Sequence, residues 1–167
     1  MRKTPLVALV ATPLLLTAAA SFAAEVSAGD RRFVEEAAAG GQAEVSDGQL
    51  AQEKGASNDV KQFGSQMVSD HSQANSELMQ IAQSKGITPP GHPTRSEMRA
   101  EKQLNRLSGS AFDRQYAKEQ VADHQKTIAL FQKEANSGTD PDLKAFANKY
   151  LPKLQQHLQM AESLNKG

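Results

Sequence analysis

The sequence of 167 residues contains no cysteine and no tryptophan, and aromatic residues make up only 5% of it. Without cysteine, the chain has no disulfide bond, no thiol nucleophile and no site for lipid attachment at a lipobox. It also lacks a glycine-rich phosphate-binding loop and a serine in a nucleophile-elbow context. The sequence therefore identifies no reaction, and a non-enzymatic role is favoured.

No charge of one sign dominates, because 19 basic side chains face 19 acidic ones and the two signs are interspersed. A chain of this kind has no basic patch with which to bind nucleic acid or an anionic membrane. We therefore expect neither as a partner. The polar composition favours a monomer or a weak dimer, and the sequence names no protein partner.

The first 23 residues have the pattern of a secretory signal peptide. Arg2 and Lys3 are followed by a mostly apolar run from Leu6 to Ala20, and small residues stand at Ser21 and Ala23. This pattern predicts cleavage after Ala23, with an uncleaved anchor as the alternative. We expect a periplasmic or secreted protein of a Gram-negative-type envelope, with no stable membrane span after cleavage and one domain over residues 24–167.

Helical periodicity and capping residues predict an all-α protein. The expected long helices cover about 30–54, 57–85, 110–136 and 140–165, and a short crossover helix covers about 94–107. Expected caps are Ser27 or Asp30, then Ser57, Thr94 with Glu97, Ser110, and Asp140 before Pro141. Two short connections and one long crossover predict a ferritin-like four-helix bundle of up-down-down-up topology. Glycines inside the first helix indicate close approach of a neighbouring backbone, and the alternative is that Gly40-Gly41 breaks this segment into two helices.

Three of the four histidines lie on the apolar stripes of three different helices. His71 and His124 each lie 14 residues after the expected caps Ser57 and Ser110, and His157 lies 17 residues after Asp140. A helix rises about 1.5 Å per residue, so the three imidazoles should meet at one depth. Buried imidazoles are good ligands for zinc, copper or iron. We predict a metal site formed by His71, His124 and His157.

Glu44 is the best acidic candidate for a fourth ligand, because it lies at the same depth on the first helix; Glu36 and Glu119 are further acidic candidates. Asp70 and Asp123 are each about 100° round the helix from a histidine, and we expect them to flank the core. His92 lies in a proline-rich loop and is expected to be solvated.

A structural role for the histidines is the alternative. In that case they form a polar layer, hydrogen-bonded to one another or to Tyr116 or Tyr150. A di-iron site of the ferritin type is not indicated, since it needs Glu-x-x-His pairs. The residues three before the histidines are Val68, Val121 and Leu154.

Several motifs resemble the bacterial domain-of-unknown-function 4142 family. They are Met67-Val68-Ser69-Asp70-His71 followed by Asn75 and Leu78, Phe112-Asp113-x-x-Tyr116, His124, Leu143-Lys144-x-Phe146-Ala147, and Leu151-Pro152-x-Leu154-x-x-His157-Leu158. The resemblance covers nearly the whole chain after the signal peptide. It implies a secreted or periplasmic ferritin-like four-helix bundle with no established reaction.

Two functions follow from these observations. The first is a periplasmic or secreted bundle that binds a transition metal through its core histidines, for metal handling or stress protection. The second is a non-catalytic helical interaction or envelope-stress module whose histidines are structural core groups.

Overall fold

The computed structural model describes residues 26–166, which form five α-helices and no strand. The helices are α1 (Ala28–Lys54), α2 (Asn58–Ser84), α3 (Arg95–Leu104), α4 (Gly109–Ser137) and α5 (Pro141–Leu164). The predicted all-α class is confirmed, and the helices begin and end within three residues of the expected bounds. The expected signal peptide, residues 1–23, lies outside the described residues.

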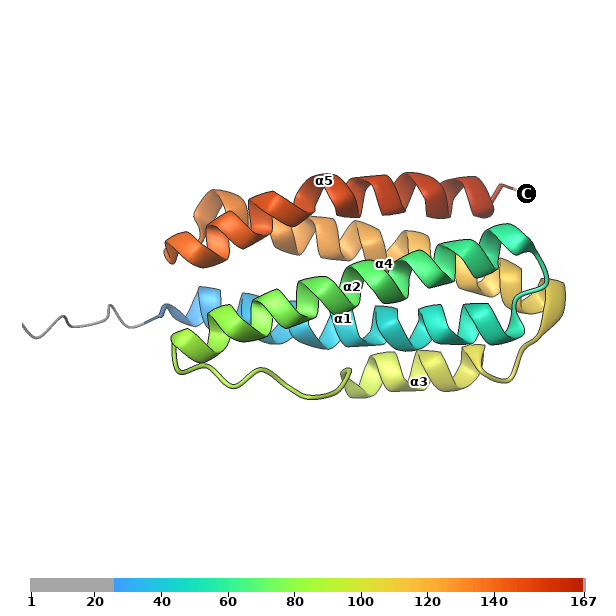
Figure 1. Cartoon of the computed structure of the whole chain (residues 1–167), viewed down its shortest axis with the longest axis horizontal. Helices are drawn as coiled ribbons and strands as arrows, with labels where there is room; N and C mark the ends of the chain where they lie inside the picture. Colours follow the sequence, from blue (N-terminus) through green and yellow to red (C-terminus); the bar gives the residue numbers. More distant parts are fainter. Residues whose placement is uncertain (1–25, 167) are drawn as a thin grey trace, which may run out of the picture.

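The four long helices form two hairpins that pack against each other (Figure 1). α1 pairs with α2 and α4 pairs with α5, and the hairpins meet with α1 against α4 and α2 against α5. In Figure 1, α1 and α5 run in one direction, while α2 and α4 run in the opposite one. The short helix α3 lies beside α1 and also contacts α4.

Side-chain caps explain where most of the helices begin. The Ser27 hydroxyl accepts a hydrogen bond from the Asp30 amide at 3.1 Å, and Ser57 accepts one from the Val60 amide at 3.1 Å. The expected capping box of Thr94 and Glu97 is present at the start of α3. Each cap satisfies an amide that has no partner within the first helical turn.

The predicted cap at Ser110 is wrong. α4 begins one residue earlier, with Ser108 at the cap position and Gly109 at a φ of 61°, a left-handed conformation that glycine adopts without strain. The Asp113 carboxylate accepts hydrogen bonds from the amides of Ala56 and Ser57, both at 2.9 Å. Asp113 therefore ties the start of α4 to the turn between α1 and α2.

Two glycines allow α1 and α2 to approach closely, as expected from the glycines in the first helix. A Cβ atom on Gly48 would lie 2.6 Å from the carbonyl oxygen of Gly64. A Cβ atom on Gly64 would lie 2.6 Å from the Cβ of Ala51 and 2.7 Å from the carbonyl oxygen of Gly48. These three distances are too short for a side chain, so the absence of one at each glycine sets the spacing of this hairpin.

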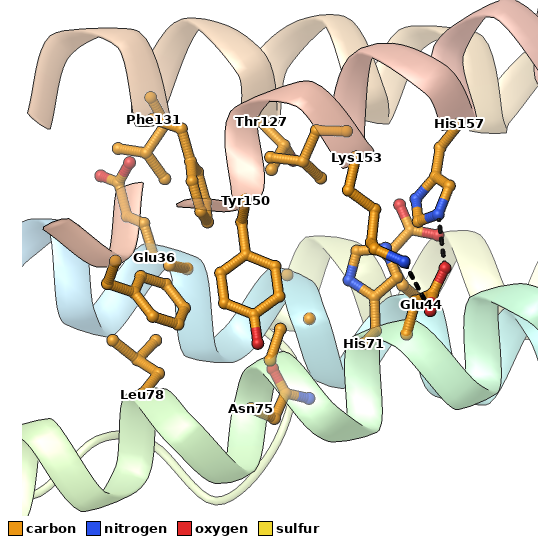
Figure 2. Close-up of a pocket in the computed structure, with 18 residues that line it drawn as sticks. Glu36, Glu44, His71, Asn75, Leu78, Thr127, Phe131, Tyr150, Lys153 and His157 are labelled. Atoms are coloured by element: carbon orange, nitrogen blue, oxygen red, sulfur yellow. Dashed lines mark hydrogen bonds and ion pairs between the residues drawn. The ribbon is translucent and has the colours of Figure 1, made fainter. Parts of the chain in front are cut away.

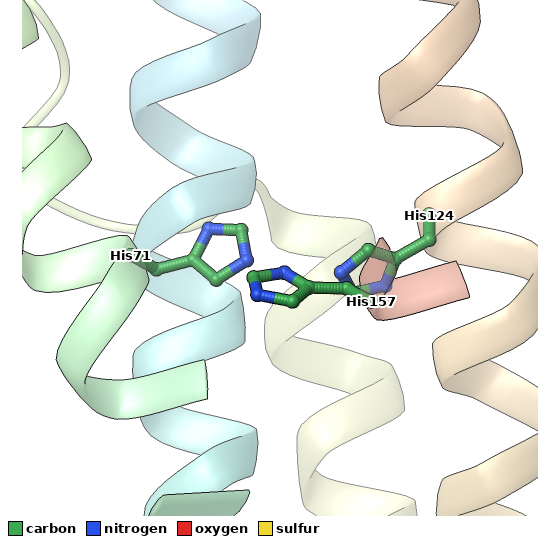
Figure 3. A group of neighbouring side chains, drawn as sticks. All are labelled: His71, His124 and His157. Carbon is green, nitrogen blue, oxygen red and sulfur yellow. The ribbon is translucent and has the colours of Figure 1, made fainter. Parts of the chain in front are cut away.

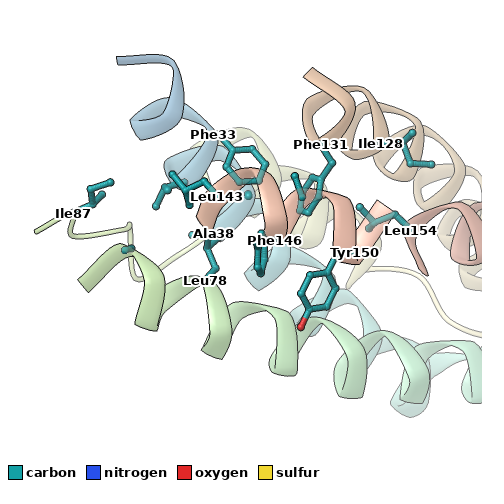
Figure 4. Close-up of a cluster of buried hydrophobic side chains, with 14 residues drawn as sticks. Phe33, Ala38, Leu78, Ile87, Ile128, Phe131, Leu143, Phe146, Tyr150 and Leu154 are labelled. Carbon is teal, nitrogen blue, oxygen red and sulfur yellow. The ribbon is translucent and has the colours of Figure 1, made fainter. Parts of the chain in front are cut away.

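The interior contains two apolar clusters along the bundle. The larger cluster includes Phe33, Phe131, Phe146, Tyr150 and Leu154, and Figure 4 shows these side chains meeting between α1, α4 and α5. Edge-on contacts join Phe33 to Phe131 and to Phe146, with ring centroids 5.1 Å and 6.3 Å apart. The second cluster is built from other buried side chains: Ala51, Val60, Phe63, Met67, Leu104, Phe112, Tyr116 and Ala161.

None of the helices within residues 26–166 is both long enough and apolar enough to cross a membrane.

Two glycines of α1 give opposite predictions for the same substitution. Gly48→Ala should lower the free energy of unfolding by about 1–3 kcal/mol, because the new methyl group overlaps the α2 backbone. Gly40→Ala should raise it by up to about 1 kcal/mol, since a Cβ there meets no atom closer than 3.9 Å and alanine is the better helix former. Urea unfolding of both variants checks the pair. A stabilising Gly48→Ala would contradict the close approach.

Candidate metal centre

Three histidines meet in the interior of the bundle, each from a different helix: His71 from α2, His124 from α4 and His157 from α5 (Figure 3). They lie beside the second apolar cluster, because the Phe63 ring is 6.5 Å from that of His124 and 6.4 Å from that of His157. In sequence, His157 lies between Leu154 of the larger cluster and Ala161 of the second. The imidazoles thus form a polar layer between two apolar ones.

The three rings are close together and shielded from solvent. Their centroids are 5.8 Å apart for His71 and His124, 5.6 Å for His71 and His157, and 5.4 Å for His124 and His157. One nitrogen from each ring lies within 4.8 Å of the others, and the exposed fractions are 7%, 0% and 1% in chain order. These three histidines could hold a metal ion.

The hydrogen bonds of two imidazoles define which nitrogen carries the proton. His124 Nδ1 lies 2.9 Å from the carbonyl oxygen of Gln120, and His157 Nε2 lies 2.9 Å from Oδ2 of Asp70. Both partners are acceptors, so these nitrogens donate. The other nitrogens, Nε2 of His124 and Nδ1 of His157, carry lone pairs, and both are buried without a partner. Nε2 of His71 is also buried without a partner.

Burial keeps the imidazoles neutral. Loss of solvent, followed by repulsion from His124 and His157, lowers the pKa of His71 to about 3. Burial likewise lowers the pKa of His157 to about 4, and it lowers the pKa of His124. A neutral imidazole with a free lone pair is the form that binds a metal.

Asp70 positions His157 from a neighbouring helix. Its Oδ1 forms an ion pair with Lys153 Nζ at 3.0 Å, while its Oδ2 accepts from His157 (Figure 2). Burial alone would raise the pKa of Asp70, but the hydrogen bonds from His157 and Lys153 hold it below its ordinary value. Asp70 flanks the core, as expected. The contact across helices from Asp70 to His157 was not expected from the sequence.

The structure does not bring Glu44 into the group of three nitrogens. Its Oε2 accepts a hydrogen bond from Gln120 Nε2 at 2.7 Å, and its Oε1 lies 3.6 Å from His124 Nδ1. Burial raises the pKa of Glu44 to about 8. Of the other acidic candidates, Glu36 pairs with Arg32 at the surface and Glu119 accepts from Gln115.

The hydrogen bonds expected for a purely structural histidine layer are absent from the described part of the chain. The tyrosine hydroxyls do not reach the imidazoles: Tyr150 donates to Glu77 at 2.8 Å, and the buried hydroxyl of Tyr116 has no partner. The histidines do not hydrogen-bond one another either. His92, expected to be solvated, is exposed in its loop.

A small cavity of about 40 Å³ reaches His71 and His157 from the side of the larger apolar cluster (Figure 2). Its lining comes from all four long helices and combines apolar side chains such as Leu78 and Tyr150 with charged ones such as Glu44 and Lys153. A space of this size holds one or two water molecules. Three imidazole nitrogens beside such a space could hold a metal ion whose fourth position is taken by a small molecule, as in catalytic zinc sites.

Comparison with known proteins identifies a family and a shared fold. The family described as "Domain of unknown function (DUF4142)" matches residues 15–164. The chain is similar to the crystal structure of a conserved hypothetical protein, rv2844, from Mycobacterium tuberculosis, with a TM-score of 0.64 and 12% identity. That match covers 83% of this chain and 92% of the other, and at this identity it shows the fold alone. No curated protein matches the chain.

The buried imidazoles predict a loss of stability in acid for the metal-free protein. In the unfolded chain, His71 takes up a proton below about pH 6.5, whereas in the folded protein its pKa is about 3. The unfolded state therefore binds more protons, and the free energy of unfolding falls as the pH drops from about 6.5 towards 3. Between about pH 7 and about pH 5, His71 should contribute a loss of about 1–2 kcal/mol.

His71→Gln removes this contribution, so comparing the variant with the wild type separates the effect of His71 from that of Glu44 and Asp47. The raised pKa values of these two acids make the free energy of unfolding rise as the pH drops, which is the opposite sign. Urea unfolding at both pH values should show a smaller loss on acidification in the variant than in the wild type. Equal losses would mean that His71 titrates in the folded protein as it does in the unfolded chain.

Proposed function

The chain belongs to the family of the domain of unknown function DUF4142, and we propose that this member binds one transition-metal ion through His71, His124 and His157. The observation that carries the proposal is that all three buried imidazoles keep a nitrogen without a hydrogen-bond partner. A buried polar atom left unpaired is rare in proteins and destabilising. A single ion would satisfy all three nitrogens at once.

Zinc, copper and iron are the metals that suit this donor set. Zn–N bonds of about 2.0–2.1 Å would place three nitrogens roughly 3.4 Å apart, so the rings must close slightly around an ion. A small molecule in the adjoining cavity, or the Glu44 carboxylate after a rotation, would supply the fourth ligand. Gln120 and Asp70 already orient His124 and His157 in the way that outer partners orient ligands.

We infer that the bundle is of the ferritin-like kind, with up-down-down-up topology. The helix directions in Figure 1 and the long crossover between α2 and α4 support this inference. The pattern of residues 1–23 supports export, with a periplasmic or secreted location. The role proposed for the protein is to handle or buffer a transition metal in that compartment, or to protect against stress caused by it.

The alternative is a helical interaction or envelope-stress module in which the histidines only support the core. One observation favours it, because His124 and His157 each already make one hydrogen bond with the protein. The two functions differ in a simple measurement. A metal that binds only the folded state raises the melting temperature, and a chelator reverses the rise.

The metal proposal predicts one ion per chain. Metal-free protein without an affinity tag should bind one equivalent of zinc, copper or iron in a calorimetric titration. His71→Ala and His124→Ala should each weaken binding by about tenfold or more, because each removes one ligand. Unchanged affinity in both variants would contradict the shared site.

His92→Ala is the matched control, since His92 is exposed in the loop between α2 and α3. It should retain wild-type affinity and stoichiometry. His71→Gln guards against a variant that loses metal only because a cavity has unfolded the core, since glutamine fills most of the volume. Failure of the wild type to bind or to melt later with any of the three metals would favour the interaction module.

Asp70 should tune the affinity without being a ligand. Asp70→Asn keeps the shape of the side chain but removes the negative charge that fixes the tautomer of His157. We expect metal affinity to fall by about 10–100-fold at unchanged stoichiometry. Glu77→Gln, two turns along α2 and bonded to Lys149 and Tyr150, should leave the affinity unchanged. Equal affinities of the two variants would remove Asp70 from the site.

A further inference from the structure

A second cavity, of about 230 Å³, lies between α1, α3 and α4, on the side of the bundle that α3 covers. Acidic side chains from all three helices line it: Glu36, Glu44, Asp47, Glu97, Glu119 and Asp123. One lysine also lines it, Lys126, and its side chain is exposed to solvent. The cavity therefore has a large excess of negative charge.

One of these acids, Asp47, has a buried carboxylate oxygen without a partner. Its side chain lines this cavity, the residue is only 9% exposed, and its Oδ1 is buried with no hydrogen-bond partner. Burying a carboxylate without a cation or a donor is strongly unfavourable. The neighbouring acids do not supply the missing partner of Asp47 Oδ1. The carboxylates of Glu44 and Glu119 themselves accept hydrogen bonds, from Gln120 and Gln115. A positive charge in the cavity would.

We propose that this acidic cavity is a second metal site, which binds a hydrated divalent cation of the oxygen-preferring class, such as Mn²⁺ or Mg²⁺, with Asp47 as its innermost ligand. Carboxylate oxygens are the ligands that these cations prefer, in contrast to the imidazoles of the histidine site. Within residues 26–166, the carboxylates of the cavity do not gather three oxygens within 4.8 Å of one another. The cation therefore keeps several water molecules, as Mg²⁺ commonly does, and the cavity has room for them.

The electrostatics of Asp47 agree with this assignment. Burial, followed by the negative charges of Glu44 and other nearby acids, raises the pKa of Asp47 to about 8. The carboxyl lacks a counter-charge in the protein itself, and a dication would provide one. Glu44 lines both this cavity and the one beside the histidines, so the two sites share a wall.

The test separates the two sites by using Mn²⁺ on a variant whose histidine site is disabled. Chelator-treated His71→Ala protein is titrated with Mn²⁺, and the electron paramagnetic resonance signal of the free aqueous ion is followed. We expect one bound Mn²⁺ per chain. Adding Asp47→Asn should weaken this binding by about tenfold or more, because it removes the innermost charged ligand.

Glu53→Gln is the matched control, since Glu53 is an exposed acid on α1 outside the cavity, and it should bind Mn²⁺ as the parent does. Asp47→Asn replaces a buried unpaired charge with a neutral side chain of the same shape, so it should fold. Asp123→Asn, at an exposed residue of α4, provides a second variant that should also weaken binding.

The outcomes distinguish this site from the histidine site. No Mn²⁺ bound to His71→Ala, or binding left unchanged by both Asp47→Asn and Asp123→Asn, overturns the acidic site even where zinc binds the wild type through its histidines. Mn²⁺ binding that depends on Asp47 supports the acidic site even where zinc fails to bind.

Discussion

The burial of three imidazoles in one layer is the constraint on which the rest of this bundle depends. The three rings are almost fully shielded from solvent, and the layer lies between two apolar clusters whose tyrosine hydroxyls do not reach the imidazoles. The rings meet only while α2, α4 and α5 hold their positions along the bundle, because a shift of one helical turn, about 5.4 Å, would separate them. The fold must therefore fix the register of the two hairpins against each other.

Contacts at the ends and within the first hairpin fix that register. Asp113 binds the turn between α1 and α2 from the start of α4, and Asp30 accepts a hydrogen bond from the Thr139 amide in the turn between α4 and α5. Each hairpin thus holds the end of the other. Gly48 and Gly64 bring α1 and α2 close together where the two residues face each other. With both ends and the spacing fixed, Asp70 on α2 can reach His157 on α5.

Features that depend on a single helix could be predicted from the sequence. Caps such as Ser57, apolar stripes and the depth of a histidine along its helix are local properties, so the helices and the meeting of the three imidazoles could be foreseen. The prediction of a cap at Ser110 was wrong because Gly109, with its positive φ, allows α4 to begin earlier. The roles of Asp70 and Asp47 could not be predicted, because each depends on how neighbouring helices are rotated about their own axes.

The charges around the histidine layer indicate how a dication could be accommodated in an apolar core. Three neutral imidazoles supply lone pairs but no negative charge, so a buried ion needs compensation from nearby groups. Asp70 accepts a hydrogen bond from Nε2 of His157, and Glu44 lies 3.6 Å from Nδ1 of His124. In both rings the other nitrogen is the one left without a partner. The burial of Glu44 raises its pKa to about 8, which favours its protonated form in the absence of an ion. An ion arriving at the imidazoles would favour the carboxylate form of Glu44. Release of that proton would place the negative charge of Glu44 near the ion, in addition to that of Asp70, which Lys153 already partly offsets.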